Sequence, residues 1–174
     1  MWRLEKSQSR DNSRTILITG STDGIGRQTA LELAKNPENH IIVHGRTVER
    51  CEAAIELYLL ANFLLVECLR DLLAQNAPSR IVLVSSMTHA WFPEGINWDD
   101  LQSTQPGAYE KMKQYSASKL GLNYFGFSLS RRLSPYRIYV NLLEPGIIQT
   151  KLLDLAGFLL LGIAWPKEPL VWFI

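Results

Sequence analysis

The segment Thr19-Gly20-Ser21-Thr22-Asp23-Gly24-Ile25-Gly26 decides the fold of this 174-residue chain. It follows a short apolar run, residues 15–19, whose β-branched side chains and polar boundaries are typical of a buried strand. It leads into a pattern from Ile25 to Ala34 that predicts a helix. Glycines between a strand and a helix let the backbone turn tightly and approach a pyrophosphate at the helix N-terminus. The segment therefore predicts a dinucleotide-binding turn, and the alternative is a glycine-rich turn without a ligand.

Strands and helices alternate along the rest of the chain. Further strands are predicted at residues 41–44, 80–84 and 138–143, and further helices at 47–75 and 112–133. This alternation predicts an α/β fold with a doubly wound parallel sheet, a Rossmann-like three-layer arrangement reduced to about four strands. We expect residues 15–174 to form one such domain after a polar N-terminal tail of residues 1–14. Ligands of these sheets lie beyond the carboxyl ends of the strands, where every motif below falls.

Composition sets limits on the function. The net charge of +1 gives no electrostatic case for nucleic acid or an anionic membrane as a partner. No apolar segment reaches the roughly 20 residues of a membrane span, and the polar N-terminus lacks the apolar core of a signal peptide. Cys51 and Cys68 form neither a disulfide framework nor a ligand spacing, and the three histidines form no metal-binding cluster. These features predict a cytoplasmic protein without a metal.

A second motif lies in the last predicted helix. In Tyr115-Ser-Ala-Ser-Lys119 the tyrosine and the lysine stand four residues apart, so they share one helix face. A neighbouring ammonium favours the phenolate and lowers a phenol pKa from about 10, which suits a general acid or base. Tyr109-Glu-Lys-Met-Lys113 has the same spacing, but it lies at a loop edge and lacks the small residues Ala117 and Ser118. We favour Tyr115, although helical spacing alone does not separate the two pairs.

Four motifs in this order resemble the short-chain dehydrogenase/reductase family, over roughly residues 15–151. They are the GxxxGIG turn, Ile81-Val-Leu-Val-Ser85-Ser86, the Tyr115–Lys119 segment and Pro145-Gly146-Ile-Ile-Gln-Thr150. The Ser-Ser-x-x-His turn and Trp98-Asp-Asp-Leu-Gln102 look like the branch that includes retinol-dehydrogenase-like enzymes. The resemblance implies an oxidoreductase that transfers a hydride between a nicotinamide cofactor and a carbonyl or alcohol. It assigns acid/base catalysis to Tyr115, tuning and ribose binding to Lys119, and orientation of the carbonyl to Ser86.

The resemblance also indicates the cofactor site. Besides Tyr115 and Lys119, the candidate residues lie in the first turn and after the last strand: Thr19, Gly20, Ser21, Asp23, Gly24, Ile25, Gly26, Pro145, Gly146 and Thr150. Arg46 follows the second strand, where an acidic residue would favour NAD(H), and Arg27 follows the last glycine. Two cations there suit a 2′-phosphate, so NADP(H) is preferred to NAD(H), with two solvated arginines as the alternative.

One internal segment departs from the family's pattern. After Arg46 the family continues through a third strand and a fourth strand that ends in Asn-Asn-Ala-Gly, and this chain has neither. Residues 48–56 resemble the helix after strand two, and residues 57–75 resemble the helix before the serine strand, so two helices are joined. A right-handed crossover then predicts the sheet order 2-1-serine strand-last strand. The family's helix asparagine falls on Tyr58, with Asn62 one turn further on as a substitute.

Two functions stay open at this point. The first is an oxidoreductase that uses NADP(H) on a small carbonyl or alcohol substrate. The second, favoured by the missing strands, is a non-catalytic shortened isoform or gene-model product that keeps only part of the dinucleotide-binding fold. Trp91, Phe92 and Phe158 favour a lipophilic substrate, whose identity the sequence does not reveal. The apolar stretch of residues 57–66 belongs to a region that builds a dimer interface in the family, so the resemblance implies a homodimer.

Overall fold

A computed structural model describes residues 14–44, 59–101, 103–146 and 148. These residues belong to two units, the first comprising residues 14–44 and the second the remainder. The predictions for Arg46 and Thr150, and that of a helix over residues 47–58, lie outside the described residues.

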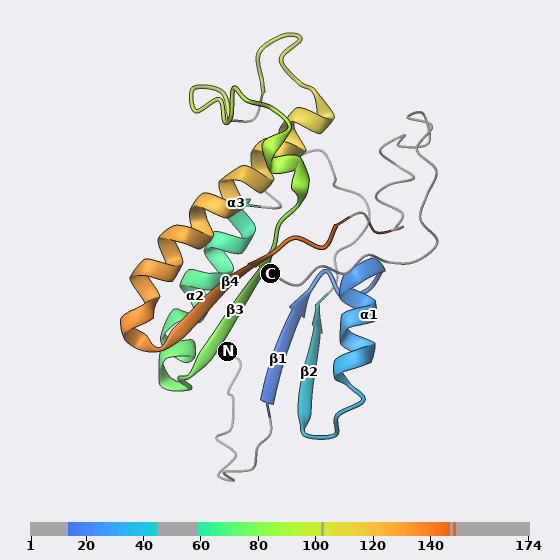
Figure 1. The fold of residues 1–174 in the computed structure, drawn as a ribbon, viewed down its shortest axis with the longest axis vertical. Coiled ribbons are helices and arrows are strands. Elements are labelled where there is room, and N and C mark those ends of the chain that lie inside the picture. Colours follow the sequence, from blue (N-terminus) through green and yellow to red (C-terminus); the bar gives the residue numbers. More distant parts are fainter. Residues whose placement is uncertain (1–13, 45–58, 102, 147, 149–174) are drawn as a thin grey trace. The chain divides into compact units, whose positions relative to one another are not determined.

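The first unit is a β–α–β arrangement. Its elements are β1 (Arg14–Thr19), α1 (Gly24–Leu33) and β2 (Asn39–His44), and α1 lies alongside the strand pair (Figure 1). The strands run parallel, from Arg14 opposite Asn39 to Thr19 opposite His44. The Asn39 side chain donates to the carbonyl of Leu33 at 2.8 Å and so fixes the return from helix to strand. This register brings the carboxyl ends of both strands to one edge, where the glycine-rich turn leaves β1.

The second unit contains the longer helices and the other strand pair. Its elements are α2 (Ala61–Gln75), β3 (Ser79–Val84), the short 3₁₀ helix η2 (Met87–Ala90), α3 (Lys111–Leu133), the 3₁₀ helix η3 (Ser134–Tyr136) and β4 (Ile138–Leu143). Strands β3 and β4 are parallel, from Ser79 opposite Ile138 to Val84 opposite Leu143. Helices α2 and α3 both lie beside this pair (Figure 1). The strands and helices predicted from the sequence in this part of the chain are confirmed, with bounds shifted by a residue or less, except for the start of α2.

The core of the second unit forms between α3 and one face of the strand pair. Alternation in β3 turns Ile81 and Leu83 inward, and the spacing of Leu122, Leu129 and Leu133 on α3 places these leucines on one helix face. Val66 of α2 and Ile138 of β4 complete the buried cluster. Full burial of one such side chain contributes roughly 1.5–3 kcal/mol. This core holds α3 against the end of β3, which fixes the location of the second group of candidate site residues.

The prediction of an α/β fold with four parallel strands is confirmed, and the pairing of β1 with β3 stays a prediction, because these strands belong to different units. Strand β1 pairs with β2 and β3 pairs with β4, as expected, and in the described part of the chain these form two separate two-stranded sheets.

Candidate functional site

The turn after β1 has the backbone that the glycine pattern predicts. Gly20 and Gly24 have φ angles of +63° and +53°, which side chains of L residues rarely adopt. A Cβ on Gly26 would lie 2.4 Å from the carbonyl oxygen of Gly20, so α1 starts in direct contact with the turn. Only glycine fits at that position without moving the backbone. The arrangement fits the pyrophosphate of a dinucleotide, which needs close backbone approach and a helix N-terminus.

Ser21 connects the turn to β2. Its side chain is buried, with 3% exposed, and its Oγ donates to the carbonyl of Ile18 at 2.7 Å. The backbone N–H of His44 donates to the same Oγ at 2.9 Å, and the Ser21 N–H donates to the His44 carbonyl at 2.9 Å. The Ser21 hydroxyl is thus engaged by the backbone of both strands. Its contribution to a cofactor site is to hold the turn at the end of the sheet.

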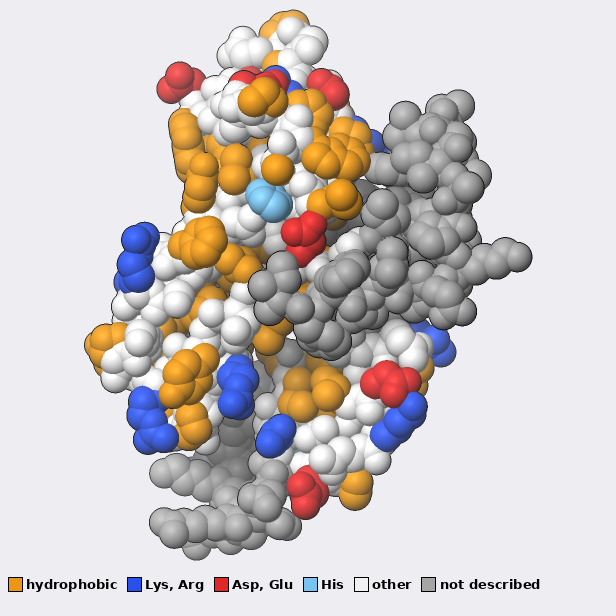
Figure 2. All heavy atoms as spheres, viewed as in Figure 1, with side chains coloured by type: hydrophobic (Ala, Val, Ile, Leu, Met, Phe, Trp, Pro, Cys, Tyr) orange, Lys and Arg blue, Asp and Glu red, His pale blue; other side chains and the backbone are white. Residues whose placement is uncertain are grey.

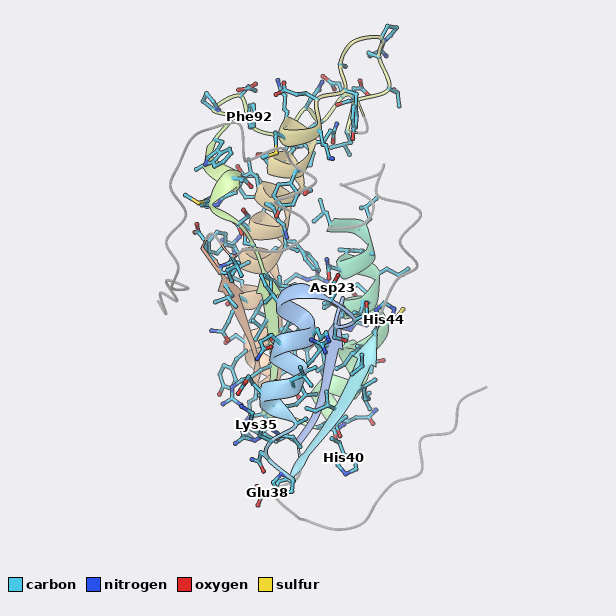
Figure 3. All side chains as sticks on the ribbon, turned by 90° about the vertical axis from the view of Figure 1, so that its right-hand side faces the viewer. Asp23, Lys35, Glu38, His40, His44 and Phe92 are labelled. Carbon is cyan, nitrogen blue, oxygen red and sulfur yellow. The ribbon has the colours of Figure 1, made fainter. Side chains whose placement is uncertain are left out.

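Asp23 caps α1. Its carboxylate accepts from the N–H of Gly24, the first residue of the helix, at 2.9 Å, and aspartate is a preferred N-cap residue. Figure 3 shows Asp23 near His44 at one end of this unit, with Lys35, Glu38 and His40 at the other end. Of the remaining cofactor candidates in this unit, Thr19 and Arg27 are exposed and Ile25 is half-buried.

Lys119 occupies an unusual position for a lysine. It is buried, with 7% exposed, and its Nζ donates to the backbone carbonyl of Val84 at 2.9 Å, at the carboxyl end of β3. Burial disfavours the charged form and lowers the pKa of Lys119 from 10.5 to about 8. Lysine is rarely buried without a role, and a desolvated amine with a lowered pKa is typical of functional sites.

Tyr115 lies one helical turn before Lys119. It is half-buried, and the Lys119 Nζ lies 5.6 Å from the centroid of its ring. The competing pair has no such arrangement, because α3 begins at Lys111 and Tyr109 precedes the helix. Lys113 forms an ion pair with Glu94 at 2.6 Å instead. The structure thus brings Lys119 to Tyr115 and pairs Lys113 with Glu94.

Ser86 caps the short helix that follows β3. Its Oγ accepts from the N–H of Thr88 at 3.3 Å, and the Thr88 hydroxyl lies 3.1 Å from the same oxygen. His89 approaches the Ser86 carbonyl with its ring Nδ1, at 2.7 Å. Helix η2 packs against α3, so Ser86 and Tyr115 belong to neighbouring elements. The sequence interpretation missed Thr88; the signal available was the Ser-x-Thr spacing, which lets a serine accept from the N–H two residues on.

The remaining candidates lie at the ends of elements. Pro145 is half-buried and Gly146 is exposed, with a φ of +70°, directly after β4. Asn62 lies half-buried in the first turn of α2. Among the described residues no group of three or more His, Cys, Asp or Glu side chains could hold a metal ion. No helix in the described part of the chain is both long and apolar enough to cross a membrane.

Comparison with known proteins gives consistent matches. A family model described as short chain dehydrogenase matches residues 103–156. Human retinol dehydrogenase 13 is 30% identical over 203 aligned positions, which include 80% of this chain and 60% of that protein. Human retinol dehydrogenase 14 is 37% identical over 129 positions, 69% of this chain and 37% of that protein. The crystal structure of a 3-alpha-hydroxysteroid dehydrogenase from Pseudomonas sp. B-0831, complexed with NADH, has a TM-score of 0.65 at 16% identity and covers 81% of this chain and 75% of that chain.

The extent of these matches agrees with the internal deletion predicted from the sequence. The chain spans 60% of the length of the first relative and 37% of the second. The first match has 203 aligned positions, but this chain contributes only 80% of its 174 residues to them. The relative therefore has residues inside the match that this chain lacks. The site features follow one another along the chain in the order of the motifs that resemble the family. The glycine turn comes first, then the serine after β3, and then the tyrosine with its buried lysine. The chain belongs to the short-chain dehydrogenase/reductase family, in its retinol-dehydrogenase-like branch.

Proposed function

We propose that this chain is an oxidoreductase that interconverts a carbonyl and an alcohol with a nicotinamide dinucleotide. The observation that carries the proposal is the buried Lys119, held at the end of β3 and one helical turn from Tyr115. Burying an ammonium costs free energy that a purely structural residue would not require. A positive charge beside a phenol has a chemical use, because it stabilises the phenolate that forms when tyrosine gives up a proton.

The residues of the second unit divide the work on the substrate. In the reductive direction Tyr115 donates its hydroxyl proton to the substrate oxygen, and Lys119 stabilises the phenolate that remains. The Ser86 hydroxyl donates a hydrogen bond to the carbonyl oxygen and steadies the charge that develops there. The nicotinamide, when bound, supplies the hydride in reduction and accepts it in oxidation. The half-buried environment of Tyr115 and Ser86 limits competition from water.

The glycine-rich turn of the first unit would hold the pyrophosphate of the cofactor. Gly20, Gly24 and Gly26 supply the backbone geometry, and Ser21 ties that geometry to both strands. NADP(H) is the proposed cofactor, because Arg27 and Arg46 provide cations for a 2′-phosphate. The related steroid dehydrogenase carries NADH, so this preference rests on the two arginines and not on the structural match.

The substrate we propose is a lipophilic carbonyl or alcohol. Aromatic side chains follow η2, with Trp91 exposed and Phe92 half-buried. The two relatives named retinol dehydrogenases support the same class by their names. A panel of aliphatic, aromatic and polyene aldehydes and ketones tests this choice, with a hydrophilic sugar aldehyde as the control. Turnover confined to the sugar aldehyde would contradict it.

A second function is compatible with the length of the chain. The chain lacks residues that its relative has within the match. A non-catalytic protein that keeps part of the dinucleotide-binding fold would show this feature. Turnover by the purified protein separates the two proposals, since the non-catalytic form has none.

The experiment that tests the oxidoreductase follows the loss of NADPH absorbance with the substrate panel. Tyr115→Phe keeps the ring and removes the proton donor, so we expect a loss of about 10²-fold or more in turnover with NADPH binding retained. Tyr109→Phe removes the same group from the tyrosine outside the helix and is the matched control, with activity expected to stay unchanged. Full turnover by Tyr115→Phe would show that the mechanism is wrong.

We also propose a homodimer that uses the outer faces of α2 and α3. Large apolar side chains are exposed there, among them Leu64 at 64% and Phe127 at 60%, and Figure 2 shows apolar side chains at the surface of this unit. Patches of this kind mark interaction sites. Light scattering of the wild type and of Leu64→Glu tests the proposal: a dimer that the charge converts to a monomer supports it, and a wild-type monomer refutes it. A cytoplasmic location stays a prediction of the sequence.

A further inference from the structure

The hydroxyl of Ser86 is held by its neighbour Thr88. The Ser86 Oγ accepts a hydrogen bond from the backbone N–H of Thr88 at 3.3 Å. The Thr88 hydroxyl donates to the same oxygen at 3.1 Å. Thr88 is itself buried, with 6% exposed, in a helix that packs against α3. Two donors from one buried residue therefore converge on the oxygen of the proposed catalytic serine.

These two bonds determine what Ser86 can still do. A serine hydroxyl has two acceptor lone pairs and one O–H donor. Both lone pairs face donors from Thr88, so the O–H is the hydrogen-bonding capacity that remains. A carbonyl oxygen of a substrate can only accept, and it needs this donor. The bond from the Thr88 hydroxyl also polarises the Ser86 O–H, because successive hydrogen bonds strengthen one another.

The backbone of the same turn is fixed from the other side. The Ser86 carbonyl accepts from the N–H of His89 at 3.1 Å, and the ring Nδ1 of His89 lies 2.7 Å from it. A carbonyl has no proton to give, so Nδ1 carries a hydrogen and is the donor. Both lone pairs of the carbonyl are thus engaged, and the turn holds Ser86 at its side chain and at its backbone.

We infer that Thr88 is a positioning residue for carbonyl reduction, which keeps the Ser86 hydroxyl available as a donor to the substrate oxygen. This inference rests on the proposed function and assigns a role to a residue outside the serine–tyrosine–lysine set. Thr88 acts through Ser86 and touches no reacting atom. Loss of the Thr88 hydroxyl should therefore lower kcat only when the Ser86 hydroxyl is present. A structural role of Thr88 would affect kcat with or without that hydroxyl.

The test uses four variants, with NADPH consumption, NADPH binding and the melting temperature measured for each. Thr88→Val replaces the hydroxyl by a methyl group of similar shape and keeps the N–H bond. We expect kcat to fall about tenfold, the effect of one lost hydrogen bond, with KM and the Kd for NADPH nearly unchanged. Thr88→Ser restores the hydroxyl and should recover most of the activity. In the Ser86→Ala background, Thr88→Val should have no further effect on kcat.

Ser79→Ala is the matched control for a merely structural hydroxyl. The Ser79 Oγ donates to the carbonyls of Leu73 and Asn76 at the opposite end of β3, at 2.8 and 3.1 Å. Its removal should lower the melting temperature and leave kcat unchanged. If Thr88→Val behaves like Ser79→Ala, or lowers kcat equally with and without the Ser86 hydroxyl, the inference is overturned and the proposed function stands. If the wild type turns over no substrate of the panel, the proposed function is overturned and the inference falls with it.

Discussion

Lys119 makes the stability of this protein depend on pH in a direction opposite to that of an ordinary paired lysine. Burial lowers its pKa from 10.5 to about 8 in the folded protein, whereas the unfolded chain has the ordinary value. Between pH 8 and 10.5 the unfolded chain therefore binds a proton that the folded protein does not. Stability rises with pH wherever the unfolded state binds more protons. The cost of burying the charge is fully present below pH 8 and is relieved as the pH rises.

The magnitude follows from the interval between the two values. At about 1.4 kcal/mol per pH unit, the relief between pH 8 and 10.5 amounts to about 3 kcal/mol. Urea unfolding of the wild type and of Lys119→Met at several pH values isolates this group, because the other titrating residues cancel in the difference. Relative to the variant, the wild type should gain about 3 kcal/mol over the interval and nothing below it.

Lys113 provides the matched control on the same helix. The hydrogen bond to Glu94 raises the pKa of Lys113 above 10.5, so the stability difference between the wild type and Lys113→Met should stay flat up to that pH and fall beyond it. A difference for Lys119→Met that is flat, or that falls between pH 8 and 10.5, would refute the burial argument. It would mean that Lys119 is solvated or paired with an anion in the folded protein.

Three further predictions concern the turn, the cofactor and the core. Gly26→Ala places a Cβ 2.4 Å from the Gly20 carbonyl oxygen, so thermal melts should show a loss on the order of 1–3 kcal/mol and no response to NADPH. Gly107→Ala, where a Cβ meets nothing within 4 Å but the φ of +75° disfavours alanine, should also lower the melting temperature and yet keep the wild-type response to NADPH. Arg27→Ala should weaken NADPH binding about tenfold and leave NADH binding unchanged in titrations, and equal losses for both would argue against a 2′-phosphate contact. Leu129 is only 1% exposed, so Leu129→Ala should lower the free energy of unfolding, measured in urea, by roughly 2–5 kcal/mol. Ser130→Ala, at an exposed site on the same helix, should lower it by less than about 0.5 kcal/mol.

The sequence predicted the local elements well because their signals are local. A short apolar run placed β3 within a residue of its true start. The glycines specified a turn in which Gly20 and Gly24 have positive φ angles and Gly26 has no room for a Cβ. The choice of Tyr115 over Tyr109 depended on where α3 begins, which periodicity does not define. Tyr115 and Lys119 both lie in α3, whereas Tyr109 precedes it, and the choice of Tyr115 as the acid or base stays a prediction.

Tertiary features were harder to predict. Helix α2 is apolar on several sides; Cys68 and Leu72 are exposed, whereas Val66 and Leu73 pack on the core. A helix with so many apolar residues does not reveal which face meets the sheet. The predicted sheet order came from the handedness of the connection, and the pairing of β1 with β3 in that order stays a prediction. The role of Thr88 depends on a side-chain contact that only coordinates reveal.

The central claim is that this shortened chain still forms a working dinucleotide-binding domain, and a thermal melt of the purified protein with and without NADPH tests it most directly. At about 100 times Kd, binding to the folded state should stabilise it by about 2.7 kcal/mol and raise a single cooperative transition. NADH at the same concentration should raise it less. A transition that is absent, or that neither cofactor moves, would contradict the claim and leave the motifs as a record of ancestry.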